Sequence, residues 1–181
     1  MAIVGLAAAI PITLLARDGS GDGNAAAERS AASIPQGFRL HGAARLRNLG
    51  VSVGVPSTWT ATRERGAIRL RSDDRTTELA VTARAGADAQ RAVLTSELDG
   101  IQRGYRVASL KAGSGRTVGG LHAKGAVVSA RTRSGTVLRI LVAVASGKAH
   151  TYVVEVFSAA EAPPARLIQA QLALRTLKLT G

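Results

Sequence analysis

The chain has 181 residues, enough for one domain of ordinary size with a tail. It carries 24 Lys and Arg against 12 Asp and Glu, a formal net charge of +12, which predicts attraction to an anionic partner. The alternative, that the abundance of arginine reflects GC-rich coding, stays open. The chain has no cysteine, which excludes disulfides, thiolate catalysis, zinc sites built on Cys and lipidation of an N-terminal Cys.

The first apolar stretch, residues 2–16, carries no charge. Fifteen helical residues span about 22 Å, less than the roughly 30 Å of a bilayer core. The length is typical of a signal-peptide apolar region, although no basic residue precedes it. A start further upstream would supply that basic segment and complete a signal-anchor. We expect residues 1–16 to be a membrane anchor or signal segment, and a buried core element is the alternative.

Residues 17–37 are rich in Gly, Ser, Ala and Asp, with Ile34 the only large apolar side chain. Such a composition predicts a flexible linker. The remainder, residues 38–181, is expected to form a single domain. Arginines after the apolar segment argue against export, but long domains that follow a first segment can be translocated regardless of charge. We therefore expect a membrane-anchored domain on the extracytoplasmic side.

The first part of the domain has the alternation of apolar and polar residues that is typical of strands. The expected strands are residues 51–55, 59–63, 67–71 and 78–84. Gly66 is a turn signal between the second and the third, and Pro56 ends the first.

A helix is expected after Asp88, which is a plausible N-cap, with Gly104 at its C-terminal cap. Its apolar face comprises Leu94, Leu98, Ile101 and Tyr105. Four further strands are expected at residues 106–111, 121–133, 136–145 and 150–157. Tight turns at Ser134-Gly135 and Ser146-Gly147-Lys148 imply antiparallel neighbours. Leu138, Ile140, Val142 and Val144 predict a buried face.

A closing helix is expected after a capping box at Ser158–Glu161. Its apolar face comprises Leu167, Ala170, Leu174 and Leu177. The predicted fold class is α+β: an antiparallel sheet with an internal helix and a C-terminal helix packed on it.

This order of elements, with Val55-Pro56-x-x-Trp59 at the end of a strand, resembles the PsbP-like α/β/α sandwich superfamily. That group includes extrinsic photosystem subunits and actinobacterial lipoproteins of the LpqN type, and the resemblance covers residues 38–181. It implies that Trp59 is a packing residue and that the domain is a binding or accessory module outside the cytoplasm. The chain departs from the lipoproteins because it has no Cys to be lipidated.

Features that would indicate catalysis have a simpler interpretation here. Ser52 matches a G-x-S-x-G pattern, but it lies in a predicted strand, where a nucleophile elbow needs a strand-to-helix turn. The glycine-rich run 113–120 leads into a strand instead of a helix N-terminus. His41, His122 and His150 lack the spacing of metal ligands, and Asp73-Asp74 is interpreted as a solvated turn balanced by Arg71 and Arg75. The sequence therefore predicts no enzyme, no cofactor and no metal site.

The candidate binding residues are five arginines on predicted strands: Arg69, Arg71, Arg131, Arg133 and Arg139. Arg69/Arg71 and Arg131/Arg133 have i, i+2 spacing, which places each pair on one side of a strand. Glu155 is expected to pair with Arg139 if the register allows it. The leading hypothesis is a non-enzymatic domain that binds an envelope protein or an anionic polymer. The alternatives are a basic protein that binds nucleic acid without sequence preference and, least favoured, a hydrolase.

Overall fold

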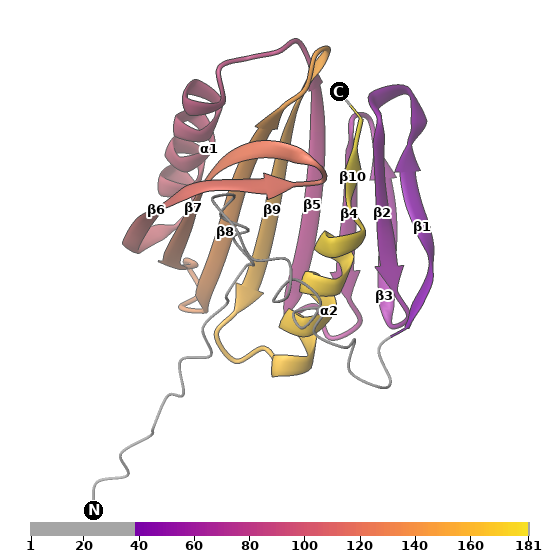
Figure 1. The fold of residues 1–181 in the computed structure, drawn as a ribbon. Helices are drawn as coiled ribbons and strands as arrows, with labels where there is room; N and C mark the ends of the chain where they lie inside the picture. Colours follow the sequence, from indigo (N-terminus) through magenta and orange to yellow (C-terminus); the bar gives the residue numbers. More distant parts are fainter. Residues whose placement is uncertain (1–38, 181) are drawn as a thin grey trace, which may run out of the picture. The chain divides into compact units, whose positions relative to one another are not determined.

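The structure, a computed structural model, describes residues 39–180. The predicted anchor at 1–16 and the predicted linker at 17–37 lie outside these residues. Among residues 39–180, no helix is both long enough and apolar enough to cross a membrane. Two antiparallel sheets and two α-helices make up the described part of the chain (Figure 1).

The larger sheet has seven strands. They are β3 (Trp59–Glu64), β4 (Ala67–Ser72), β5 (Thr77–Ala85), β6 (Arg106–Val118), β7 (Leu121–Arg131), β8 (Val137–Ser146) and β9 (His150–Ala159). Their order across the sheet is β3-β4-β5-β9-β8-β7-β6, so β3 and β6 are the two edges. Helix α1 (Gln90–Gly104) lies in the connection between β5 and β6, which is the long crossover from the middle of the sheet to one edge.

The smaller sheet has three strands in the order β1-β2-β10: β1 (Leu40–Leu46), β2 (Val51–Pro56) and β10 (Lys178–Leu179). A short 3-10 helix, Arg47–Leu49, joins the first two. Helix α2 (Pro164–Thr176) packs against β2 and β5. The smaller sheet and α2 cover one face of the larger sheet, called here the α2 face, and α1 covers part of the opposite face, the α1 face (Figure 1).

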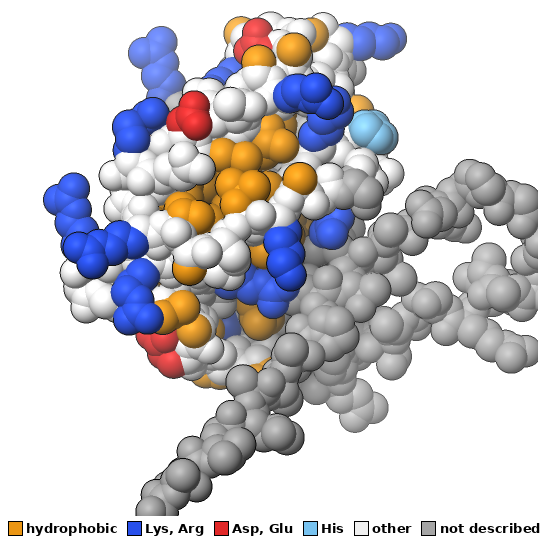
Figure 2. Space-filling model, turned by 90° about the vertical axis from the view of Figure 1, so that its left-hand side faces the viewer, with side chains coloured by type: hydrophobic (Ala, Val, Ile, Leu, Met, Phe, Trp, Pro, Cys, Tyr) orange, Lys and Arg blue, Asp and Glu red, His pale blue; other side chains and the backbone are white. Residues whose placement is uncertain are grey.

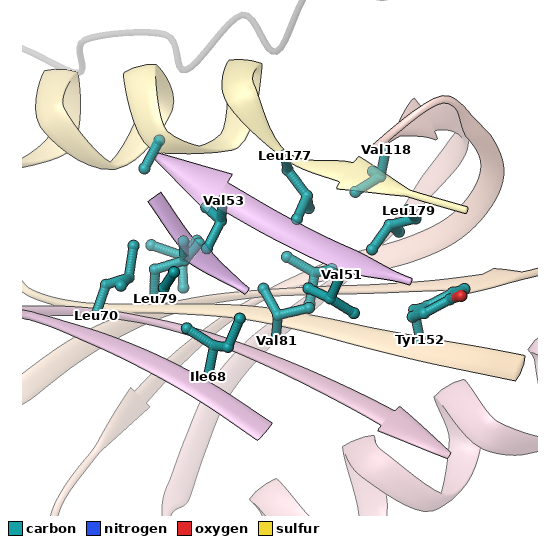
Figure 3. Packing of buried hydrophobic residues seen from close by; sticks show 14 of the residues in the cluster. Val51, Val53, Ile68, Leu70, Leu79, Val81, Val118, Tyr152, Leu177 and Leu179 are labelled. Carbon is teal, nitrogen blue, oxygen red and sulfur yellow. The ribbon is translucent and has the colours of Figure 1, made fainter. Parts of the chain in front are cut away.

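The main core fills the space between the α2 face and the smaller sheet. Leu79, Val81 and Tyr152 rise from the larger sheet toward Val51 and Val53 of β2 (Figure 3). The hydroxyl of Tyr152 lies 3.1 Å from the carbonyl oxygen of Leu49 and 2.8 Å from that of Thr180, and donates to them. One buried phenol therefore ties the end of β10 and the turn before β2 to the larger sheet.

The second core lies under α1. Ile140, Val142 and Val144 of β8 are fully buried and pack with Val93 and Ile101 of the helix. Partly buried side chains complete this core: Leu94, Leu98, Tyr105, Val107, Leu138 and Phe157. The predicted apolar faces of the helix and of the strand are both confirmed.

The α+β fold class with two helices on an antiparallel sheet is confirmed, but the predicted helix caps are wrong. The N-cap of α1 is Ala89, without a side-chain hydrogen bond, and the C-cap is Tyr105 in an extended conformation. Ser158 lies inside β9, where it pairs with Arg139 and Thr77, and α2 begins after Pro163. Sheet pairing of Ser158 therefore prevails over the local capping-box pattern.

The sequence prediction also omitted two strands and shortened a third. Strand β1 carries weak alternation, β10 has only two residues, and both are held by their pairing with β2. Strand β6 continues to Val118, because register shifts after Val107 and after Gly113 let it keep pairing with β7. These irregularities break the period of two that marks a strand in sequence.

Candidate binding surface

Trp59 is a packing residue, buried in the main core with 3% of its surface exposed. Its indole nitrogen donates to Oε1 of Gln169 at 2.8 Å, and the guanidinium of Arg166 donates to the same oxygen at 2.9 Å. Arg166 also binds the carboxylates of Asp73 and Asp74. The motif that carried the resemblance thus anchors α2 to the strand β3.

The Asp73-Asp74 pair is part of this anchor. Hydrogen bonds from Ser72 and from Arg166 hold the pKa of Asp74 well below its usual range. The prediction that Arg71 and Arg75 balance these carboxylates is wrong. The cation that pairs with both is Arg166, which follows Asp73 by 93 positions and Asp74 by 92.

Arg69 and Arg71 lie side by side on the α1 face of β4, as their spacing predicts. Both are paired with Glu78 of the neighbouring strand β5: Arg69 at 3.0 Å and Arg71 at 2.6 Å. Arg69 also lies 3.5 Å from Glu64. The hydrogen bond to Glu78 raises the pKa of Arg69. Acidic neighbours therefore balance much of the charge of this pair.

Arg139 and Arg131 lie on the opposite side of the sheet, on the α2 face. Their neighbours along the strands, Ile140 and Ala130, belong to the core under α1, and successive side chains of a strand alternate between faces. Arg133 lies beyond the end of β7, in the turn before β8. The structure therefore does not bring the five predicted arginines together, and the expected common side for Arg131 and Arg133 is wrong.

The α2 face of β6, β7 and β8 carries two further basic residues. Arg106 lies directly opposite Arg131, and Lys111 lies opposite Val127, which in turn pairs with Leu141. Residues directly opposite each other in an antiparallel pair point to the same face. We call Arg106, Lys111, Arg131 and Arg139 the basic patch; all four are exposed.

Apolar side chains lie among the members of the basic patch. Half-buried Val127 and Leu141 form a row with Lys111, and Val137, 39% exposed, lies opposite Arg131. Helix α2 packs over β2 and β5, away from this part of the face. The patch is thus an accessible sheet surface with an apolar floor and basic side chains around it.

The chain around the basic patch is free of acid. From Gly100 to Val154 there is no Asp or Glu, and there are nine basic residues. These are Arg103, Arg106, Lys111, Arg116, Lys124, Arg131, Arg133, Arg139 and Lys148. Figure 2 shows the side of the molecule that holds α1 and β6, where Lys and Arg outnumber Asp and Glu around an apolar area. This run without acidic residues is the sequence signal by which Arg106 and Lys111 could have been identified as candidate binding residues.

Ion pairs are concentrated in the other part of the domain. Within residues 39–180, the six ion pairs use Arg69, Arg71, Arg84 and Arg166 as cations. No member of the basic patch is among them in that range. Arg131 donates instead to the carbonyl oxygen of Gly135 in the following turn, at 3.3 Å.

Arg106 and Arg131 form a cross-strand pair of like charge, which destabilises a sheet by a few tenths to about 1 kcal/mol. Neither has a carboxylate partner within the described range. A surface that retains such repulsion is suited to a ligand that brings negative charge.

Glu155 does not pair with Arg139, contrary to the sequence prediction. It lies opposite Val142 of β8 and Ala80 of β5, on the α1 face, whereas Arg139 is on the α2 face. Burial, reinforced by the nearby charge of Glu97, raises the pKa of Glu155. Glu155 therefore does not neutralise the charge of Arg139, which lies on the other face of the sheet.

The features that resemble catalytic motifs lie in ordinary secondary structure. Ser52 is half-buried within β2, as predicted, and the glycine-rich run forms the end of β6 and a turn at Gly119-Gly120. His41 contacts the carbonyl oxygen of Pro56 at 3.1 Å. In the part of the chain that the structure describes, no group of three or more His, Cys, Asp or Glu is placed to hold a metal.

The described aromatic residues belong to the cores. Trp59 and Tyr152 are buried. Tyr105 and Phe157 pack together beneath α1, with ring centroids 6.4 Å apart. Between residues 39 and 180 there is therefore no exposed Trp, Tyr or Phe side chain on which a nucleic-acid base would stack, and single-strand recognition normally relies on such stacking.

Known structures share this fold. The Ran-binding protein Mog1p of Saccharomyces cerevisiae matches with a TM-score of 0.52 and 13% identity, over 78% of this chain and 95% of Mog1p. Cyanobacterial PsbP (CyanoP) of Synechocystis matches with a TM-score of 0.50 and 11% identity, over 76% of this chain and 91% of CyanoP. No family model and no curated protein sequence matches. The domain thus has the fold common to PsbP and Mog1p, as the resemblance implied, and such low identity shows the fold alone.

Proposed function

We propose that this protein is a membrane-tethered, extracytoplasmic binding domain without enzymatic activity, and that it engages an anionic envelope component through the basic patch. The observation that carries the proposal is the separation of charge: nine basic and no acidic residues between Gly100 and Val154. Complementary charge both attracts a partner from a distance and orients it.

The fold and the local chemistry support a binding role. Mog1p is described as a Ran-binding protein, so this fold is compatible with recognition of a macromolecule. The α2 face of β6–β8 offers Lys111, Arg131 and Arg139 in neighbouring strands, with side chains on a rigid sheet. The tether and the export rest on the sequence of residues 1–37, through the apolar segment and the polar spacer.

A binding measurement tests the role of the basic patch. The full chain, kept in mild detergent, is titrated with fluorescein-labelled polyphosphate, and anisotropy is followed at several salt concentrations. The triple variant K111Q/R131Q/R139Q should bind more weakly, and the slope of log K against log salt should fall by about 3, one for each lost contact.

The matched control is R45Q/R63Q/R65Q, which removes the same charge from exposed positions on β1 and around the β3–β4 turn. Its affinity and slope should stay near those of the parent chain, because distant surface charges are screened within about 8 Å at physiological salt. Equal losses in the two variants would show that net charge acts without a defined surface, and would overturn the proposal.

Export is tested separately with a C-terminal alkaline phosphatase fusion and a matching fluorescent-protein fusion. Active phosphatase in the membrane fraction supports an extracytoplasmic tethered domain. Fluorescence without phosphatase activity would place the domain inside the cell and contradict that part of the proposal.

A further inference from the structure

We infer that the partner of the basic patch is the anionic headgroup surface of a phospholipid bilayer. This inference rests on the proposed function and narrows it to one ligand chemistry. The domain would lie with the α2 face of β6–β8 against the membrane, with basic side chains at the phosphate groups and apolar ones directed to the interface.

The composition of the patch distinguishes a bilayer from a soluble polyanion. Val137 is 39% exposed and lies directly opposite Arg131, while Val127 and Leu141 lie half-buried in the row beside it. Exposed apolar side chains gain little from a highly charged polymer, but they are stabilised at the boundary between headgroups and acyl chains. Each basic residue near an anionic leaflet adds to the attraction, and strands β6–β8 themselves carry no Asp or Glu.

The chain before the domain also favours a membrane surface. The sequence predicts an apolar anchor at residues 1–16, followed by a linker at residues 17–37 that tethers the domain to it. Such a tether raises the local concentration of bilayer surface seen by the patch, so individually weak contacts suffice for docking.

The test uses the full chain carrying Val137→Trp, mixed with vesicles of phosphatidylcholine alone or of equal parts phosphatidylglycerol and phosphatidylcholine. The readout is the fluorescence emission of this tryptophan. Binding of the chain to vesicles would not discriminate, because residues 2–16 would hold the chain on either type. Trp59 is buried in the core and supplies a constant background. The introduced tryptophan should shift to shorter wavelength, and be quenched by brominated acyl chains, only on the anionic vesicles.

Adding K111Q/R131Q/R139Q to this chain should reduce the docking equilibrium about 100-fold, which abolishes the shift. The control R45Q/R63Q/R65Q should keep it, and circular dichroism verifies that both variants are folded. A second reporter, Leu110→Trp, lies on β6 opposite Val128 and so on the α1 face. It should show a smaller shift than the reporter at position 137.

Three outcomes would overturn the inference: equal emission on both vesicle types, equal loss in the control variant, or a larger shift at position 110. If polyphosphate is bound but no vesicle shift occurs, the lipid inference fails and the proposed function stands. If neither is bound, both fail.

Discussion

Tyr152 illustrates how much one residue contributes to this fold. It is fully buried, and its hydroxyl donates to the backbone carbonyls of Leu49 and Thr180, which lie next to each other where β2 begins and β10 ends. Burial also raises the pKa of this phenol, so it stays protonated as a donor. A carbonyl that loses its donor in the interior is costly, whereas the ring itself contributes packing.

We therefore predict that Tyr152→Phe destabilises the domain by about 1–2 kcal/mol while keeping the core filled. Urea unfolding followed by circular dichroism measures the change. The control Tyr105→Phe removes the hydroxyl of a partly buried tyrosine under α1 and should have a smaller effect. Equal stability of the Tyr152 variant and the parent would show that the two hydrogen bonds add nothing.

At Glu155 we expect a substitution to stabilise the domain, in contrast to Tyr152→Phe. The folded-state pKa of Glu155 is raised by burial first and by Glu97 second, so the protonated form is favoured in the native state. Its contribution to stability is present at low pH and is lost as the pH rises through the folded pKa. Other charged groups that act on it are Arg69, Glu78 and Arg84.

Glu155→Gln should stabilise the domain by about 0.5–1 kcal/mol at neutral pH and have no such effect at low pH. Denaturant unfolding of parent and variant across pH 4 to about 8 gives the difference. Glu161→Gln, on the exposed loop before α2, serves as the control. A stabilisation that does not change with pH would contradict the assignment to Glu155.

At the scale of elements, the like-charged pair Arg106 and Arg131 joins β6 and β7. Their repulsion lowers the stability of the sheet, while their positive charge belongs to the proposed binding surface. Arg131→Glu places a carboxylate opposite Arg106 and converts repulsion into attraction. We expect stability to rise by a few tenths to about 1 kcal/mol and polyphosphate affinity to fall. Thermal unfolding and anisotropy on the same sample provide both numbers. Increased stability without weaker binding would remove Arg131 from the binding surface.

The elements that could be predicted from sequence are those with an uninterrupted period. The strand around Ile140 and Val142 and the helix with Leu94 and Ile101 carry regular apolar spacing, and both are confirmed. Strand β10 has two residues and exists because it pairs with β2 and covers the main core through Leu179. No local pattern encodes that pairing, so it could not be predicted.

The candidate surface could be predicted only in part, because which face a strand residue occupies depends on register. The i, i+2 spacing of Arg69 and Arg71 shows that they share a face, but not that Glu78 lies opposite Arg71. Likewise, a bulge after Val107 sets which residues of β6 join Arg131 and Arg139. The charge excess was visible in sequence, while its division between two faces required the structure.

At the scale of the whole described domain, charge divides along the larger sheet. The β3–β5 side holds Glu64, Asp73, Asp74 and Glu78, each in contact with an arginine. The charged residues of strands β6, β7 and β8 are all Lys or Arg. The larger sheet thus presents one region of balanced charge and one positive region, and the second is the region proposed to attract an anionic partner.

Amide chemical-shift mapping shows directly whether an anionic partner binds to the α2 face of β6–β8. The isotopically labelled full chain in detergent micelles is titrated with polyphosphate. The largest shifts are expected on β6, β7 and β8 around Lys111, Arg131 and Arg139. The largest shifts on β3 and β4, around Arg63, Arg65 and Arg69, would contradict this expectation.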